Sequence, residues 1–156
     1  MPSFKEISDP TPLGEIIKSA FDTSLPVSGG WGYTQEGATV LESNRQKIPL
    51  SQYEHMLISM RSYLEMNMTQ EEHTRYGSIN VTEISRETYQ TDRMIYDKVI
   101  YEVRAMPEAM YASFVDEYKT HYGNESFDLD DHFKRRREAT LLRNVTYWFE
   151  VSQLYA

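Results

Sequence analysis

The sequence predicts an α+β fold: a mostly antiparallel sheet of about four strands, with three or four helices packed mainly on one face. Apolar residues recur at helical spacing in residues 53–68 and 110–122, and they alternate in residues 94–104 and 141–151. The order of these segments lacks the regular strand–helix–strand alternation of a parallel sheet. A chain of 156 residues is long enough to bury one core, so we expect a single globular domain over residues 1–156.

The N-terminal part of the chain predicts one helix and a glycine-rich loop. Thr11 and Pro12 indicate the start of the helix, because a threonine hydroxyl caps free amides and proline suits the first helical position. Residues 25–37 hold four glycines and a proline, which predict turns around Trp31 and Tyr33. A short strand is expected directly after this loop.

The strongest periodic pattern is a long helix that begins near residue 51. Ser51 and Glu54 have the spacing of a capping box, in which both side chains satisfy free amides of the first turn. Ile58 and Met66 lie with the polar residues on the helical wheel, so we expect them to form an outward-facing candidate interaction face. The inward stripe is expected to contain Tyr53, Met56, Leu57, Met60, Tyr63, Leu64 and Met68.

Two consecutive strands follow the long helix. In residues 78–89 the apolar residues alternate and then slip phase at Ile84, as a β-bulge would cause. Residues 94–104 alternate again. The link of residues 90–93 is too short for a parallel crossover, so the two strands are expected to form an antiparallel hairpin.

The C-terminal part predicts two helices and a last strand. One helix is expected after Pro107, and a second after Asp128, whose carboxylate suits an N-cap. The second helix ends in the basic run 134–137, which complements the helix dipole and offers a possible grip for a phosphate or an acidic partner. In the last strand, residues 141–151, Arg143 interrupts the inward-facing apolar positions.

Composition excludes several classes of function. The chain has 16 Lys and Arg against 24 Asp and Glu, a formal charge of −8, which argues against nucleic acid and against an anionic membrane surface as partners. It has no apolar stretch near the ~20 residues that span a bilayer and no signal-peptide core, so a cytoplasmic location is expected. The absence of cysteine excludes disulfides, thiol catalysis and thiolate metal sites.

No motif in the chain predicts a metal or a cofactor. The glycine-rich loop lacks the Lys-Ser/Thr pair of a phosphate-binding P-loop. The group Asp128, Asp130, Asp131 and His132 lacks the later ligands and the central glycine of a calcium loop. We therefore expect no bound metal and no cofactor, and interpret these aspartates as helix caps.

Four residues stand out as candidate binding or pocket residues: Trp31, Tyr33, His132 and Arg143. A tryptophan in a loop can line a groove, and an imidazole on an apolar helix stripe has a tunable pKa. An arginine at an inward strand position needs a carboxylate partner if it is buried. Each also has a structural explanation, as core edge, core histidine or strand end.

Two functions remain open from the sequence. The first is a small protein-binding protein, of the immunity or regulatory type, with a protein partner or a second copy of itself; acidity, aromatic richness and the missing catalytic motifs favour it. The second is an enzyme or small-ligand binder with a pocket of dispersed residues near the Trp31 loop and His132. The sequence favours the first.

Overall fold

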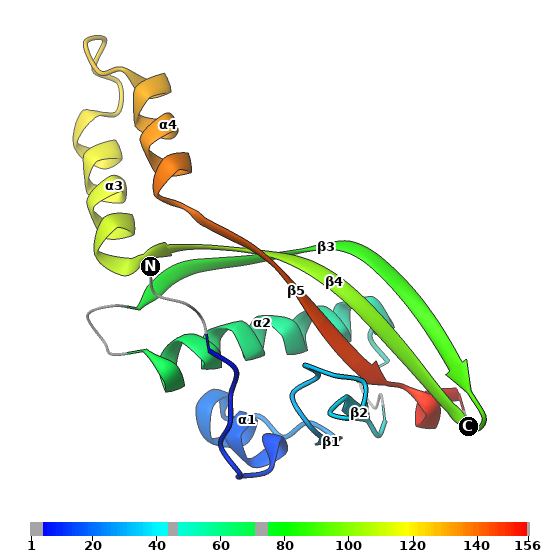
Figure 1. Ribbon diagram of the computed structural model, residues 1–156. Helices are drawn as coiled ribbons and strands as arrows, with labels where there is room; N and C mark the ends of the chain where they lie inside the picture. The colour runs from blue at the N-terminus through cyan, green and yellow to red at the C-terminus, as the bar shows by residue number, and fades with distance from the viewer. Residues whose placement is uncertain (1–4, 44–46, 71–74, 156) are drawn as a thin grey trace.

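The computed structural model describes residues 5–43, 47–70 and 75–155, and within them the chain is α+β (Figure 1). A five-stranded sheet has the order β1-β2-β5-β4-β3. The elements are α1 (Leu13–Phe21), β1 (Val27–Gly29), β2 (Thr39–Leu41), α2 (Leu50–Thr69), β3 (Tyr76–Thr91), β4 (Met94–Pro107), α3 (Glu108–His121), α4 (Leu129–Ala139), β5 (Leu141–Glu150) and the 3-10 turn η2 (Ser152–Tyr155).

The sheet is antiparallel at every strand pair except β2 with β5, which run parallel. The α+β prediction is confirmed, but the described sheet has five strands where about four were expected. The additional strand is β1, which lies inside the segment that the glycines marked as turns. It is only three residues long, and its pairing with β2 depends on a contact that composition does not reveal.

The β3–β4 hairpin confirms the predicted antiparallel pair. Its strands pair from Tyr76 with Pro107 to Thr91 with Met94, and a register shift between Glu83 and Ser85 coincides with the predicted phase slip. Asp92 takes a positive φ of 43° in the tight turn. Aspartate tolerates this left-handed conformation better than most residues, so the turn can be very short.

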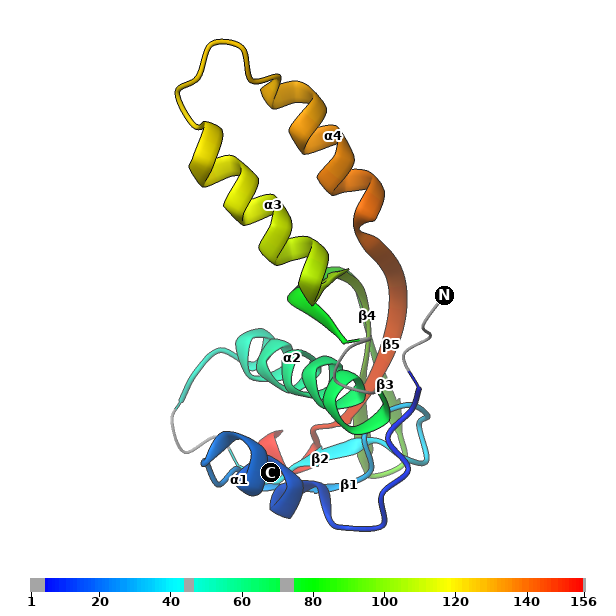
Figure 2. The same cartoon turned by 90° about the vertical axis from the view of Figure 1, so that its left-hand side faces the viewer.

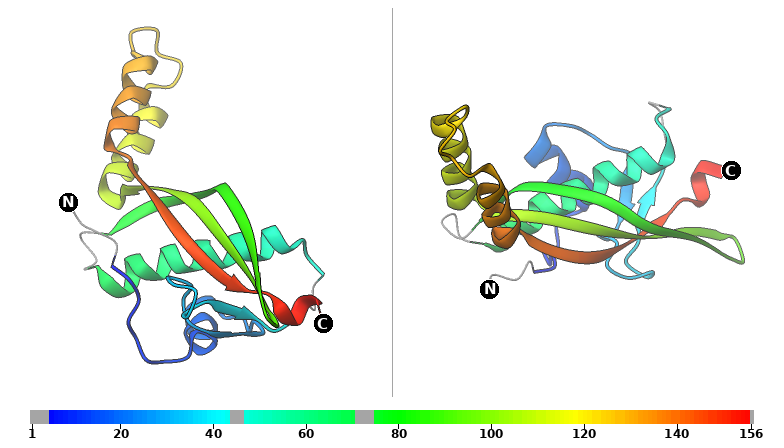
Figure 3. Two further views of the ribbon diagram at one scale, coloured as in Figure 1. Left: turned by 45° about the vertical axis from the view of Figure 1, so that its right-hand side comes forward. Right: turned by 90° about the horizontal axis from the view of Figure 1, so that it is seen from above.

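Helix α2 lies along one face of the curved sheet, and α1 lies on the same side (Figures 1 and 3). The prediction that Ile58 and Met66 form an outward interaction face was wrong, because they are only 0% and 3% exposed. Tyr63, expected inside, is instead exposed. The buried side of α2 also carries the charged residues Arg61 and Glu65. Because these polar residues point toward the core, the buried face of the helix differs from the face that apolar periodicity predicted.

The first turn of α2 also differs from the prediction. Its N-cap is Pro49, no side chain caps the helix, and the Pro49 carbonyl accepts from the amides of Gln52 and Tyr53. Glu54 does not close a capping box because its side chain is fully buried against the sheet. Similarly, α1 begins at Leu13 with Pro12, rather than Thr11, at the N-cap.

Helices α3 and α4 form a hairpin that projects beyond the end of the sheet (Figures 1 and 2). The expectation that the helices pack mainly on one face therefore holds for α1 and α2 only. The hairpin joins β4 to β5, which are neighbouring strands paired at Ala105 and Leu141. α3 touches β3 and β4 as well as α4, so the hairpin is anchored at its base.

The glycine-rich loop is fixed to β5 by a close approach at Gly32. Gly32 has φ 80°, its carbonyl accepts from the amide of Trp148 at 2.7 Å, and a Cβ atom there would overlap the ring of Tyr147. Gly123 has a similar φ of 84°, but a Cβ atom there would meet nothing within 4 Å. An alanine at position 123 would therefore suffer backbone strain alone, whereas an alanine at position 32 would suffer both backbone strain and overlap with Tyr147.

We expect Gly32→Ala to lower the free energy of unfolding by about 2 to 4 kcal/mol, since strain and overlap add. Gly123→Ala, with strain alone, is expected to cost about 1 kcal/mol. Urea unfolding followed by circular dichroism measures both. Equal losses in the two variants would show that the loop does not pack closely on Tyr147.

Candidate functional site

The structure separates the residues that the sequence suggested for one pocket. Trp31 and Tyr33 lie in the loop between β1 and β2 and pack into the main core. His132 lies in α4, within the projecting hairpin (Figure 1). Among the described residues, the Trp31 loop and His132 therefore lie in separate parts of the fold and do not come together in one pocket.

Trp31 and Tyr33 surround a buried cation, Arg61 of α2. Its guanidinium donates to the carbonyls of Trp31 at 3.1 Å and Thr146 at 3.0 Å. It also lies between two rings, 4.5 Å from the centroid of Tyr33 and 4.4 Å from that of Tyr147. A desolvated guanidinium needs such partners, and here they come from the loop and β5 together.

A carboxylate completes this cluster. The Tyr33 hydroxyl donates to Glu65 at 2.7 Å and accepts from the amide of Ile7 at 3.0 Å. Burial raises the pKa of Glu65, while Arg61, the Tyr33 hydroxyl and Arg143 oppose that rise. Arg143 is half-buried and acts on a carboxylate from its inward strand position. Trp31, Tyr33 and Arg143 thus contribute to the architecture of the core.

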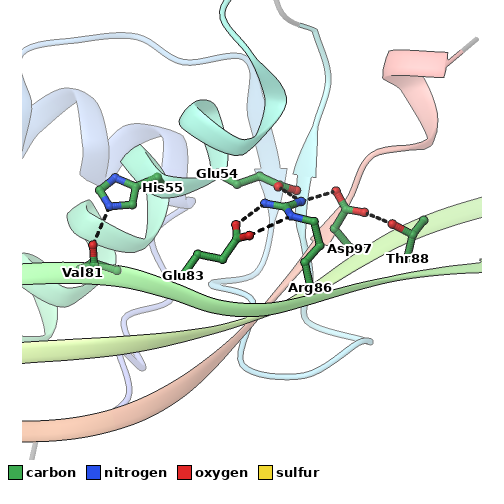
Figure 4. Close-up of polar contacts among 7 residues, drawn as sticks. All are labelled: Glu54, His55, Val81, Glu83, Arg86, Thr88 and Asp97. Atoms are coloured by element: carbon green, nitrogen blue, oxygen red, sulfur yellow. Dashed lines mark hydrogen bonds and ion pairs between the residues drawn. The ribbon is translucent and has the colours of Figure 1, made fainter.

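A second polar network ties the start of α2 to the β3–β4 hairpin (Figure 4). Arg86 of β3 donates to Glu54 of α2 at 2.6 Å and to Asp97 of β4 at 3.3 Å. It also contacts Glu83 at 2.7 Å, and Thr88 donates to the far oxygen of Asp97 at 2.8 Å. One cation therefore serves three carboxyl groups.

Burial and the neighbouring Asp97 favour the protonated form of Glu54 at neutral pH. Burial, followed by the nearby Asp97, raises the pKa of Glu54 to about 9, against the opposing effect of Arg86. A protonated Glu54 still accepts from Arg86 through its carbonyl oxygen. Such a group has the pKa of a general acid, but it is fully buried and its contacts join three elements of the fold. We interpret the network as structural.

The α3–α4 hairpin has a small core of its own, centred on His132. The imidazole is fully buried, with the rings of Phe114, Tyr118 and Phe127 between 5.6 and 5.9 Å from it, centroid to centroid. Its Nδ1 lies 3.2 Å from Glu117. The sequence correctly placed His132 on an apolar stripe, and the structure shows that this stripe joins the two helices.

Ion pairs fasten the same helices. Arg135 of α4 contacts both oxygens of Glu117 on α3 and pairs with Asp131 at 2.9 Å. Arg135, followed by His132, lowers the pKa of Glu117 to about 2. These ion pairs and the His132 core therefore hold α3 and α4 against each other, although the hairpin has few contacts with the sheet.

One side of this hairpin exposes large apolar side chains. Tyr118 contacts Tyr122 and Phe133, with ring centroids 5.3 and 6.3 Å apart, which places these three on one side. Tyr111 precedes Tyr118 by two helical turns, and Leu129 precedes Phe133 by one. Tyr122 is 72% exposed, the highest value among the exposed large apolar residues of the described chain. We call this surface the hairpin flank: Tyr111, Tyr118, Tyr122, Leu129 and Phe133.

A basic cavity lies at the base of the hairpin flank. It has a volume of about 350 Å³ and is lined by three arginines, Arg104 of β4 and Arg136 and Arg137 of α4. Tyr111 and Phe133 of the flank line it as well. The sequence marked Arg136 and Arg137 within a basic run, but Arg104 reaches the same cavity from a strand that precedes α3 and α4.

A second, apolar cavity of about 400 Å³ lies between α1, α2 and β3. Its lining includes three methionines, Met56, Met60 and Met66, beside the rings of Tyr63 and Tyr76. Methionine side chains adapt to ligands of different shapes. None of the four residues that the sequence proposed for a pocket lines this cavity.

A metal centre and a membrane helix are both absent from the described residues. Among them, no three His, Asp or Glu side chains converge as metal ligands. None of the described helices is both long and apolar enough to cross a membrane.

The pKa of Glu54 gives a prediction for stability against pH. Between pH 4.5, its ordinary pKa, and about 9, the folded chain keeps a proton that the unfolded chain releases. The contribution of Glu54 is thus fully present below pH 4.5 and is lost as the pH rises toward 9, at up to about 1.4 kcal/mol per pH unit. Glu54→Gln removes the titration, so its stability relative to the natural chain should rise from pH 5 to 8.

Urea unfolding at a series of pH values measures this difference. The exposed Glu36→Gln is the matched control, and its stability relative to the natural chain should not change with pH in the same direction. Parallel stability curves for Glu54→Gln and the natural chain would show that Glu54 is ionised in the fold.

The chain was also compared with known proteins. The comparisons with protein-family models, with curated proteins and with solved structures found no match.

Proposed function

We propose that this protein acts by binding another protein, and that the hairpin flank of α3–α4 is its contact surface. The observation that supports this is the position of the flank, which lies on a hairpin that projects from the sheet (Figure 2). The flank carries exposed tyrosine, phenylalanine and leucine side chains. Exposed apolar residues that gather in one patch indicate an interaction surface.

The composition of the flank suits binding. Tyrosine and other aromatic residues are enriched among the residues that dominate interface energies, since their rings bury a large area with few rotatable bonds. The flank also needs little ordering before it binds. His132 and the contacts of Arg135 with Glu117 already hold the two helices together.

The partner that fits is a protein segment with apolar and acidic side chains. Apolar groups would cover Tyr122 and Leu129, while acidic groups would meet the three arginines of the basic cavity at the other end of the flank. Opposite charge at one end fixes the orientation of a partner and excludes basic segments. This preference is unusual for a chain of net charge −8.

Selection from a phage-displayed library of random peptides tests the proposal even though the partner is unidentified. We expect enriched peptides that combine aromatic or aliphatic residues with Asp or Glu. Tyr122→Asp and Leu129→Asp should each weaken their binding by about tenfold or more, because each places a charge in an apolar contact. Ile84→Asp, an exposed position on β3, is the matched control and should bind normally.

Two outcomes would contradict the proposal. Peptides that bind all three variants equally would show that the flank is not the contact surface. A dimer in sedimentation that Tyr122→Asp disperses would place a second copy of the chain on the flank in place of an acidic segment.

A second function, small-ligand binding, is supported by the methionine-lined cavity. Saturable binding of an apolar fluorophore that Met56→Trp abolishes, together with a failed peptide selection, would favour this function. Tryptophan at position 56 would fill the cavity without touching the hairpin flank.

A further inference from the structure

The basic cavity concentrates positive charge in an otherwise acidic chain. Three arginines from β4 and α4 line about 350 Å³, and none of the described Asp and Glu residues lines it. The chain as a whole carries a formal charge of −8. Like charges that share a cavity repel each other, so this arrangement is favourable when an anion lies between them.

Within the described residues, the three arginines are only partly neutralised by carboxylates. Arg104 donates to Glu102 through Nε at 2.8 Å, which leaves its two terminal nitrogens for another acceptor. Arg136 lies 5.7 Å from the ring centroid of Phe133, a contact that keeps its charge. Neither Arg136 nor Arg137 pairs with a carboxylate in the part of the chain that the structure describes.

The other residues that line the cavity indicate which chemical groups the rest of a ligand would carry. The rings of Tyr111 and Phe133 and the side chain of Met106 supply apolar surface beside the charges. Thr140 also lines the cavity, and its hydroxyl donates to the Arg136 carbonyl at 2.7 Å, which helps to hold the end of α4 in place. The cavity therefore combines three arginines with apolar lining residues.

We propose that this cavity binds a phosphomonoester carried on an aromatic or apolar group. A phosphomonoester has close to two negative charges and three acceptor oxygens, and guanidinium groups bind such oxygens in pairs. A carboxylate offers one charge and two oxygens to the same three cations. The phosphate belongs either to a free small molecule or to a phosphorylated side chain, and the two share this chemistry.

A small probe contains the whole recognised group, so binding at this cavity can be measured without the proposed protein partner. Isothermal titration calorimetry with phenyl phosphate is the direct measurement. Inorganic phosphate tests the need for the apolar group, and phenylacetate tests the need for the second charge. We expect phenyl phosphate to bind about tenfold or more tightly than either.

Variants distinguish binding of the anion in the cavity from a general attraction between the anion and positive charge on α4. Arg104→Gln and Arg137→Gln should each weaken phenyl phosphate binding by about tenfold or more, since each removes a charged donor from the anion. Lys134→Gln removes the same charge from the same helix outside the cavity lining, and should change the affinity by less than about threefold. Circular dichroism checks that each variant is folded.

Three results would overturn the inference: no heat of binding with phenyl phosphate at about 10 mM, equal affinity for phenylacetate, or equal losses in Lys134→Gln and Arg137→Gln. A phosphotyrosine peptide then identifies the source of the phosphate. Tighter binding of the peptide than of phenyl phosphate, reduced by Leu129→Asp, indicates a phosphorylated side chain. Equal binding of the two indicates a small molecule.

Discussion

The guanidinium of Arg61, buried between the rings of Tyr33 and Tyr147, joins three parts of this fold that lie far apart in the sequence. It joins α2 to the Trp31 loop and to β5 through two backbone carbonyls. Apolar packing alone would allow this loop many positions on the sheet, whereas a desolvated cation that needs acceptors allows few. The loop in turn holds β1 and β2, so the short edge of the sheet depends on this contact.

Buried charge on α2 also explains which parts of the fold the sequence could predict. The β3–β4 hairpin, the bulge near Ile84 and the apolar alternation of β5 are local patterns with a period of two, and the structure has all three. The face of α2 could not be predicted in this way. Glu54, Arg61 and Glu65 are buried because of partners on other elements, so a polar residue on the helical wheel did not mean an exposed one. Ile58 and Met66 were misplaced for this reason.

For the candidate sites too, the sequence could predict only what depends on neighbouring residues in the chain. His132 was recognisable because it shares an apolar stripe with Leu129 and Phe133 on its own helix, although the rings of Phe114 and Tyr118 that bury it lie on α3. For the basic cavity, the sequence indicated only the basic run that contains Arg136 and Arg137, and it gave no sign of Arg104. Arg104 joins them because α4 is followed by β5, which pairs with β4 so that Arg104 lies opposite Leu142. A strand register of this kind is set by the whole sheet, and no local pattern near Arg104 indicates it.

The position of the α3–α4 hairpin separates the proposed contact surface from the contacts that stabilise the sheet. The hairpin leaves the sheet after Ala105 and returns at Leu141, and these two residues pair with each other. The strands β4 and β5 therefore keep their ladder whatever the hairpin does, much as a longer loop between paired strands costs little extra entropy. Its helices pack on each other through His132 and Arg135 rather than on the main core. A surface carried on such an insertion is free to change in sequence, because the buried charges that fix α2 and the sheet lie elsewhere.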